Sequence, residues 1–382
     1  RSANDEGEHR ECIALHGRRS VHAAARSRNS GRGASRAGHA DDELIPEGRP
    51  MTSALEWLYG LEQFGIKFGL DNISTLVEAL DHPERSFRSV HVAGTNGKGS
   101  VTAMVESVLR YAGYRSARYT SPHLIDLTER FFIRGRPVDS TTLERAVEKI
   151  RALVDGLRSK GSLEVSPTFF EVTTALAFDL FRAAEVEIAV CEVGLGGRLD
   201  ATNVLMPEVC AITSIGLDHE KYLGTTLREI AFEKAGIIKE GVPIVIGRLA
   251  PAAREAISEI AAARHAPLLD SAHGHDLEML AIGLRGLHQV ENAAVALKII
   301  ELLDTHGIAI PHRAIEEGFA RVSWPGRLDI RRLADGREVL LDAAHNPDGA
   351  RALAAYIRAS PSSGAPLVFG AMSLKTTSYG AN

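Results

Sequence analysis

Short apolar runs alternate with stretches of helical periodicity along most of this 382-residue chain. The apolar runs predict strands at Ser89–Ala93, Ile188–Val193, Val209–Ile215, Pro243–Ile246, Val339–Leu341 and Leu367–Phe369. The intervening periodicity predicts helices at Val101–Tyr111, Glu171–Ala183, Leu227–Ile238, Pro251–Ala263, Val290–Leu303 and Ala350–Arg358. Strands that are apolar throughout and separated by helices predict an α/β fold with a mostly parallel sheet covered on both faces. In such sheets, ligands bind beyond the carboxyl ends of the strands.

Composition excludes several classes of protein. The chain is 45% hydrophobic and 24% charged, which is typical of a globular protein with a core. No apolar stretch approaches the roughly 18–20 residues that a membrane-spanning helix needs. A net charge of −5 argues against a nucleic-acid binder. The spacing of Cys12, Cys191 and Cys210 fits neither a disulfide framework nor a zinc site, which favours the cytoplasm.

Residues 1–50 differ from the rest of the chain. They contain nine arginines, no lysine and few large apolar residues, so they are predicted to be disordered. The stretch from Arg10 to Arg36 contains Glu11 as its only acidic residue and resembles a transit peptide. The favoured interpretation is a non-native extension ahead of Met51, where a helical pattern begins. A Pro-Gly break then divides the remainder into domains at 51–324 and 325–382.

A glycine-rich loop between a predicted strand and a predicted helix is the strongest local signal. Its residues are Gly94, Thr95, Asn96, Gly97, Lys98, Gly99 and Ser100. Glycines allow the backbone amides to point at an anion, and the helix N-terminus adds a favourable dipole. The loop departs from the usual phosphate-loop pattern, because Val92 replaces the first glycine and Gly99 separates lysine from serine. A turn without a ligand is the less favoured alternative, since the chain has only nine lysines.

Polar residues follow several other predicted strands. Glu192 is placed to bind Mg²⁺, and Ser121 offers a hydroxyl nearby. His219 stands between two acidic residues, and a ligand role and a structural role remain open for it. Composition alone favours an exposed surface position for Lys234.

Two further segments carry candidate chemistry. For Thr168–Glu171, core packing of the two phenylalanines is the default, and stacking on a planar ring is the alternative. Asp342 and His345 follow a predicted strand, and Arg327 lies where it could reach a phosphate. These residues indicate an enzyme that uses ATP and Mg²⁺. They leave a kinase, an ATPase and a ligase open, whereas the lack of an N-K-x-D sequence disfavours a GTPase.

Eight motifs together resemble one family. In order they are G-T-N-G-K-G-S, T-S-P-H-L, T-F-F-E, E-V-G-L-G-G-R-L-D-A-T-N, D-H, F-E-K-A-G-I, W-P-G-R-L and D-A-A-H-N-P. From about Met51 to Met372, the chain resembles folylpolyglutamate synthase/dihydrofolate synthase of the Mur ligase superfamily. The resemblance implies a monomeric two-domain enzyme, with a P-loop domain followed by a Rossmann-like domain.

The resemblance also implies a reaction. ATP phosphorylates a substrate carboxylate, and the amine of L-glutamate attacks the acyl phosphate to form an amide. The implied substrates are dihydropteroate, tetrahydrofolate polyglutamate and L-glutamate, with ATP and Mg²⁺ as cofactors. The enzyme would act in folate biosynthesis and one-carbon metabolism.

Residue roles follow from the same resemblance. It assigns the ATP phosphates to Gly94–Ser100, and further nucleotide contacts to Asn292, Arg327 and Asp342. It assigns one Mg²⁺ to Ser121 and Glu192 and a second to His219, and it matches Lys234 to a lysine that CO₂ carbamylates. The pterin substrate is assigned to Thr168, Phe169, Phe170, Glu171, Leu199, Asp200 and Ala201. His345 is placed near the incoming glutamate, so the catalytic set becomes Lys98, Lys234, Asp342 and His345.

The resemblance stops at Met372, and Ser373–Asn382 matches nothing in the family. We therefore expect residues 325–382 to form an incomplete glutamate-ligase domain with two strands, a marginal arrangement. On that basis the chain is expected to be weakly active or inactive. The alternative function is a nucleotide-binding remnant without ligase turnover. A peptidoglycan-building relative matches the motifs less well.

Overall fold

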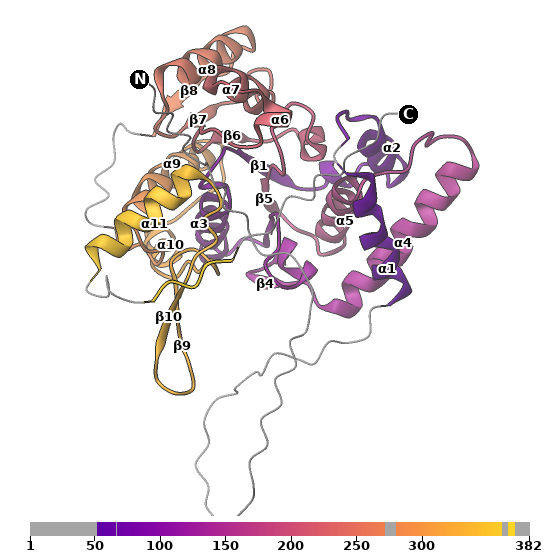
Figure 1. The fold of residues 1–382 in the computed structure, drawn as a ribbon. Coiled ribbons are helices and arrows are strands. Elements are labelled where there is room, and N and C mark those ends of the chain that lie inside the picture. The colour runs from indigo at the N-terminus through magenta and orange to yellow at the C-terminus, as the bar shows by residue number, and fades with distance from the viewer. Residues whose placement is uncertain (1–51, 66, 272–279, 361–365, 371–382) are drawn as a thin grey trace, which may run out of the picture.

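An eight-stranded sheet forms the centre of the protein, seen here in a computed structural model (Figure 1). The structure describes residues 52–65, 67–271, 280–360 and 366–370, so the predicted extension 1–50 and the segment 373–382 lie outside the described residues. The strand order is β4-β3-β2-β5-β1-β6-β7-β8. The strands are β1 (Arg88–Ala93), β2 (Ser116–Tyr119), β3 (Phe131–Ile133), β4 (Arg136–Pro137), β5 (Ile188–Glu192), β6 (Val209–Ile212), β7 (Ile244–Ile246) and β8 (Leu268–Asp270).

The prediction of a mostly parallel sheet is confirmed. β1 lies between β5 and β6 and pairs in parallel with both. β2 joins β5 in parallel, and β6, β7 and β8 continue in parallel on the other side. Only β3 and β4, at one edge, are antiparallel. The sequence patterns located β1, β5, β6 and β7 to within a few residues but did not predict β2, β3, β4 or β8.

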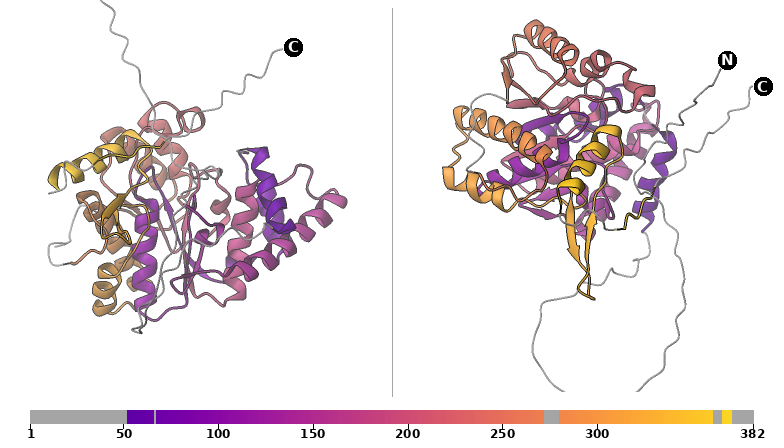
Figure 2. Two further views of the ribbon diagram at one scale, coloured as in Figure 1. Left: turned by 60° about the horizontal axis from the view of Figure 1, so that its bottom comes forward. Right: turned by 60° about the vertical axis from the view of Figure 1, so that its left-hand side comes forward.

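Helices cover both faces of the sheet (Figure 2). The α-helices of the described residues are α1 (Ser53–Gly60), α2 (Asp71–Ala79), α3 (Lys98–Tyr111), α4 (Ser140–Ser159), α5 (Phe169–Ala183), α6 (Glu220–Leu223), α7 (Leu227–Ala235), α8 (Pro251–Ala263), α9 (Leu287–Thr305), α10 (His312–Ala320) and α11 (Pro347–Ala359). One face packs on α3, α9 and α10. The other face packs on α1, α2, α4 and α5 at one end and on α7 and α8 at the other.

Alternation along the strands explains why their sequences are apolar throughout. In β5, Ile188 and Val190 belong to the core beneath α3, whereas Ala189 and Cys191 belong to the core beneath α5. Successive side chains of a strand point to opposite faces, so burial on both faces requires an uninterrupted apolar run. The central strands are therefore held rigidly, and the loops at their ends are positioned by a packed core.

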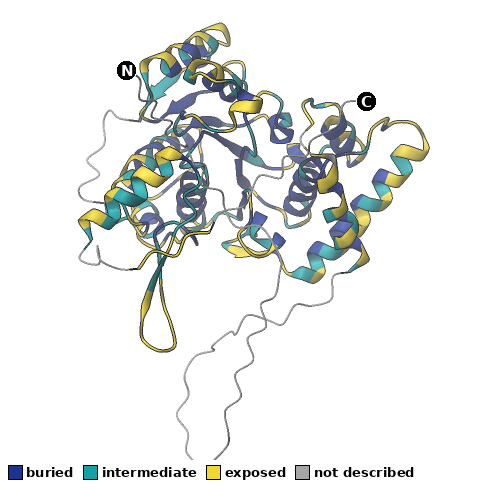
Figure 3. Ribbon diagram, viewed as in Figure 1, coloured by how far each residue is buried: buried dark blue, intermediate teal, exposed yellow. Residues whose placement is uncertain are grey.

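The described residues after 325 add no strand to this sheet. β9 (Asp329–Arg332) and β10 (Glu338–Leu341) form an antiparallel hairpin, and α11 has no buried residue (Figure 3). The predicted strand Val339–Leu341 is confirmed as β10, although it is antiparallel. The predicted strand Leu367–Phe369 is wrong, because residues 366–370 have no regular secondary structure and these three side chains are 60–95% exposed. Among the described residues, no strand lies beside it to form a sheet.

Candidate active site

The carboxyl ends of four neighbouring parallel strands carry the predicted site residues. The order β2-β5-β1-β6 places these ends side by side. β1 leads into the loop Gly94–Gly97, β2 leads to Ser121, β5 ends on Glu192, and β6 leads toward His219. Residues far apart in the sequence therefore meet at the carboxyl ends of the central strands, as the strand pattern predicted.

The glycine-rich loop turns sharply between β1 and α3. Gly97 caps the helix with a φ of 89°, in the region that favours glycine. A Cβ atom at Gly97 would lie 2.2 Å from Oδ1 of Asn292 on α9. A side chain at position 97 is therefore disfavoured for two reasons: the positive φ angle and the close contact with Asn292. The loop is also tied to the end of β6, because the amide of Thr95 donates to the carbonyl of Ser214 at 2.8 Å.

Lys98 starts α3, three residues earlier than the helical pattern predicted. Its ammonium donates to the carbonyls of Gly94 (3.1 Å) and Thr95 (3.2 Å), so the side chain folds back over the loop. Lys98 Nζ also lies 4.0 Å from Oε1 of Glu192. This cation is therefore placed beside the loop amides and the carboxylate at the end of β5.

Lys234 on α7 is buried, with 4% of its surface exposed, so the surface position that composition favoured is wrong. Its Nζ donates to the carbonyl of Gly94 at 3.0 Å, the same oxygen that accepts from Lys98. Burial, reinforced by the positive charge of Lys98, lowers the pKa of Lys234 to about 7. Near neutral pH a substantial fraction of this amine is therefore uncharged and nucleophilic.

Glu192 and Ser121 are neighbours across the ends of β5 and β2. The amide of Ser121 donates to Oε2 of Glu192 at 3.2 Å, and Ser121 precedes a cis proline. Burial raises the pKa of Glu192, while Lys98 and Arg327 act in the opposite direction. A nearby cation stabilises the ionised form of a buried carboxylate more strongly than that of an exposed one.

His219 stands at the start of α6 with a φ of 51°. Its Nε2 lies 3.8 Å from Oδ1 of Asp218, and about half of the side chain is exposed. Burial of the other half lowers the pKa of His219; Asp218 opposes this shift, and the positive charges of Lys234 and Lys98 add to it. The shift favours the neutral imidazole, which is the form that binds metals.

These residues suit Mg²⁺ as oxygen and nitrogen donors around a phosphate loop. Within the described residues, no group of three or more His, Cys, Asp or Glu side chains could hold a metal by itself. Mg²⁺ is usually held by one or two carboxylates together with water and substrate phosphates. The pair of Glu192 and Ser121 fits that requirement. The Lys98 ammonium lies 4.0 Å from the buried Glu192 carboxylate, so a metal ion could bind this carboxylate directly.

The linker and the following strand are organised around Asp342. Its carboxylate accepts from the amides of Leu328 and Ala344, each at 2.9 Å. Arg327 donates to the carbonyl of Gly326 at 3.2 Å, and its charge is among those that lower the pKa of Glu192. Nε2 of His345 lies 3.8 Å from Oδ2 of Asp218. The sequence-predicted Arg327 and His345 thus lie close to the strand-end residues.

The T-F-F-E segment begins α5 through a capping box. The amide of Thr168 donates to Oε2 of Glu171 at 2.7 Å, and the amide of Glu171 donates to Oγ1 of Thr168 at 3.2 Å. Phe169 is buried and stacks on Tyr59 with ring centroids 5.8 Å apart, which agrees with core packing. Phe170 is half-buried, and its ring is within 2.5 Å of where a Cβ of Gly194 would stand. Only Phe170 therefore faces the loop after β5.

Asp200 holds that loop in shape. Its Oδ2 accepts from the amide of Leu195 at 2.9 Å, and its Oδ1 accepts from the amide of Thr202 at 3.0 Å and from the Thr202 hydroxyl. These bonds start the short 3₁₀ turn Ala201–Val204. Phe170 thus approaches Gly194 in the same loop as Leu199–Ala201, although the Asp200 carboxylate is already used within that loop.

Sequence patterns missed two contacts on the phosphate loop. A Cβ at Gly99 would lie 2.8 Å from Cζ2 of Trp324, so the indole packs directly on the first turn of α3. This contact explains the glycine between lysine and serine. The side chain of Asn346 pairs with that of Asn96, and its partner Asp218 also lies in the site. The W-P-G-R and H-N-P motifs were the available signals, but neither indicates a contact partner.

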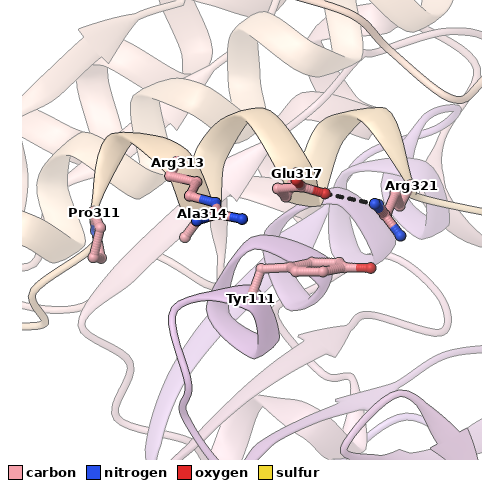
Figure 4. Close-up of a pocket in the computed structure, with 6 residues that line it drawn as sticks. All are labelled: Tyr111, Pro311, Arg313, Ala314, Glu317 and Arg321. Carbon is pink, nitrogen blue, oxygen red and sulfur yellow. Dashed lines mark ion pairs between the residues drawn. The ribbon is translucent and has the colours of Figure 1, made fainter.

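A groove of about 520 Å³ lies elsewhere, at the opposite end of α3 from the phosphate loop (Figure 4). Its lining residues are Tyr111, Pro311, Arg313, Ala314, Glu317 and Arg321. Glu317 and Arg321 pair with each other at 2.7 Å. None of the predicted site residues lies in this groove.

A lysine-bearing phosphate loop, beside a carboxylate and a buried lysine at the edge of a parallel sheet, defines an α/β nucleotide-binding protein of the Mur ligase type. Residues 92–266 match the Mur ligase middle domain. This match begins within β1 and contains Lys98, Glu192, His219 and Lys234.

Relatives of known function specify the family. The dihydrofolate synthase/folylpolyglutamate synthase of Bacillus subtilis is 39% identical over 325 residues, which cover 79% of this chain and 74% of that protein. The Escherichia coli protein of the same name is 33% identical over 332 residues, covering 82% and 74%. A folylpolyglutamate synthase in complex with AMPPCP and folate has a TM-score of 0.74 at 32% identity, covering 81% of this chain and 80% of that one. The Thermotoga maritima folylpolyglutamate synthase gives 0.71 at 35% identity, covering 80% and 74%.

This chain belongs to the dihydrofolate synthase/folylpolyglutamate synthase family. It is an ATP-dependent carbon–nitrogen ligase that adds glutamate, and the expectation of a ligase is confirmed. The comparisons support this function rather than the alternative of a nucleotide-binding remnant. Among the described residues, no helix is both long and apolar enough to cross a membrane.

Proposed function

We propose that the chain uses ATP and Mg²⁺ to join L-glutamate to dihydropteroate and to extend tetrahydrofolate polyglutamate. The observation that carries this proposal is the convergence of Lys98 and Lys234 on the Gly94 carbonyl, with Glu192 4.0 Å from Lys98. A cation at a phosphate loop suits transfer of the γ-phosphoryl group to a carboxylate oxygen. The acyl phosphate then supplies a leaving group for attack by the amine.

The phosphate loop would bind the nucleotide through its backbone amides and Lys98. Lys98 would stabilise the negative charge that develops on the transferred phosphoryl oxygens. Asn292 reaches the loop at Gly97 and would contact the nucleotide from α9. Arg327 and Asp342 would do so from the linker, which the Asp342 carboxylate holds in place.

Ser121 and Glu192 would hold one Mg²⁺ and His219 a second, together with nucleotide phosphates. The metal, when bound, neutralises phosphate charge and polarises the phosphoryl oxygens. The contribution of the chain is the preformed contact between the Ser121 amide and the Glu192 carboxylate. The buried Glu192 and the imidazole of His219 would provide an oxygen and a nitrogen donor.

We also propose that CO₂ carbamylates Lys234. The reaction requires a neutral amine, and the lowered pKa of about 7 provides one. The amine nitrogen adds to the carbon of CO₂ and releases one proton, which leaves a carbamate anion. This step replaces an amine that can carry a positive charge beside Lys98 by an anion, and it would remove the repulsion that the ammonium form exerts on a metal ion there.

The pterin substrate would lie against Phe170 and the loop from Gly194 to Ala201. Phe170 is the half-buried aromatic of the T-F-F-E segment, and Asp200 fixes the shape of the opposing loop. Thr168 and Glu171 would act by setting the start of α5 rather than by direct contact. We propose that the domain of residues 51–324 carries this site and that 325–382 belongs to the second domain.

The test is ADP release by the purified chain with ATP, Mg²⁺ and L-glutamate, with dihydropteroate or tetrahydrofolate as the acceptor. We expect release only when glutamate and one acceptor are both present. Dependence on dihydropteroate would identify the dihydrofolate synthase activity, and dependence on tetrahydrofolate the polyglutamate synthase activity. ADP release that neither acceptor alters would contradict the proposed function.

A further inference from the structure

The side chain of Asn346 makes hydrogen bonds to three separate segments. Its Nδ2 donates to Oδ1 of Asn96 in the phosphate loop at 3.0 Å and to Oδ2 of Asp218 at 3.1 Å. Its Oδ1 accepts from Nδ2 of Asn96 at 3.2 Å and from the amide of Gly349 at 2.9 Å, which caps α11. The residue is 7% exposed although α11 itself has no buried residue.

These four bonds use the whole capacity of the amide. A carboxamide has two N–H donors and two oxygen lone pairs, and each of them has a partner here. Aspartate would provide the acceptors but neither donor, and it would place a second carboxylate beside Asp218. Serine would keep the helix cap but lose the donated bonds. Position 346 therefore requires asparagine for its side-chain hydrogen bonds to Asn96 and Asp218, and not only for capping α11.

Asn96 is fixed from its other side by the end of β6. Its amide donates to the hydroxyl of Ser214 at 2.9 Å, and its carbonyl accepts from the hydroxyl of Thr213 at 2.6 Å. The loop backbone is thus held by the central sheet, and its side chain is held by Asn346. Because Asn346 follows His345, this bond also sets where the start of α11 lies relative to the phosphate loop.

We propose that Asn346 is a positioning residue that joins the segment of His345 to the phosphate loop, so that the acyl phosphate meets the amine rather than water. The inference rests on the proposed function, because it concerns the fate of that intermediate. When glutamate attacks, the bond between the acyl carbon and the phosphate oxygen breaks, inorganic phosphate leaves, a C–N bond forms, and the amine loses a proton. When water attacks instead, the same bond breaks and the carboxylate is regenerated, so ATP is consumed and no amide forms.

The experiment measures ADP and amide in the same reaction for the wild type, Asn346→Ser and Asn346→Ala. ATP, Mg²⁺, L-glutamate and dihydropteroate are supplied to the 382-residue chain. In the wild type we expect equal amounts of ADP and amide. In both variants we expect the amide formed per ADP to fall about tenfold, the scale of one lost hydrogen bond to a charged group.

Asp139→Ala is the matched control. Asp139 caps α4 by accepting from the amide of Thr142, as Asn346 caps α11, but it lies outside the site. This variant should lose thermal stability while its ADP and amide remain equal. Asn346→Ser keeps a capping side chain and should melt close to the wild type, which separates positioning from folding.

Three results would contradict the inference, and each can be told apart from the others. If the wild type couples ADP release to amide formation and Asn346→Ser does so equally well, the positioning role is wrong while the proposed function stands. If only Asn346→Ala loses coupling, in proportion to its loss of stability, the role of the residue is capping and the inference is also wrong. If the wild type forms no amide, the proposed function fails and the inference fails with it.

Discussion

Replacing Lys98 by methionine is expected to lower amide-forming turnover by about 10²–10³-fold, the scale of losing one charge-stabilising donor in an active site. The methionine keeps the length and apolar character of the side chain, so helix α3 should still form. What is lost is the ammonium that contacts the carbonyls of Gly94 and Thr95 and approaches Glu192. The measurement is kcat and KM for ATP at saturating glutamate and dihydropteroate.

Lys149→Met is the control for removing a lysine. Lys149 is more than half exposed and pairs with Asp179 at 2.6 Å, on a helix that does not contribute to the site. It should change turnover by less than about twofold, since the pair lies outside the site and Asp179 keeps Arg182 as a partner at 2.6 Å. Unchanged turnover in Lys98→Met would contradict the placement of phosphoryl transfer at this loop.

Replacing Lys234 by methionine should abolish turnover and at the same time stabilise the fold. The wild-type amine is buried, and its pKa of about 7 shows that the fold disfavours the charged form. Methionine removes that cost, which at pH 7 is on the order of 4 kcal/mol. The Gly94 carbonyl keeps a donor, because Lys98 also bonds to it. The free energy of unfolding, measured in CO₂-free buffer, should therefore be higher for the variant.

The stability difference should depend on pH with a definite sign. In the unfolded chain the lysine titrates near 10.5, and in the fold near 7. Between these two values the unfolded chain binds more protons, so the stability of the wild type rises with pH across this window. The advantage of Lys234→Met should be largest at pH 7 and should shrink toward pH 10. A variant that is less stable than the wild type at pH 7, or a difference independent of pH, would contradict the assignment of a buried, neutral amine.

Sequence patterns could predict the central sheet because its strands are buried on both faces. Runs such as Ile188–Cys191 carry no polar residue, and helical periods fill most of the sequence between such runs. The short edge strands β3 and β4 gave no such signal, since Arg136–Pro137 is exposed and resembles a loop. The prediction of a strand at Leu367–Phe369 was wrong although the run is apolar, because a strand also needs a neighbouring strand to pair with.

The site was predicted in part. Strand ends located Glu192 and the phosphate loop, because parallel order forces such loops to one edge. The burial of Lys234 could not be predicted from composition, since it depends on α7 packing over the Gly94 carbonyl. The bond between Asn96 and Asn346 spans 250 positions, and no local pattern encodes a contact at that distance. The family resemblance supplied residue identities, whereas the structure supplied their partners.

The most direct test of the acyl phosphate mechanism is to measure whether an oxygen atom of the substrate carboxylate is transferred to inorganic phosphate. Dihydropteroate labelled with ¹⁸O in its carboxylate is incubated with ATP, Mg²⁺, L-glutamate and the chain, and the inorganic phosphate and amide are analysed by mass spectrometry. If ATP phosphorylates the carboxylate, one labelled oxygen leaves with the phosphate and the other remains in the amide carbonyl. Labelled phosphate formed together with the amide is the result we predict. Amide formation with unlabelled phosphate would contradict an acyl phosphate intermediate at this phosphate loop.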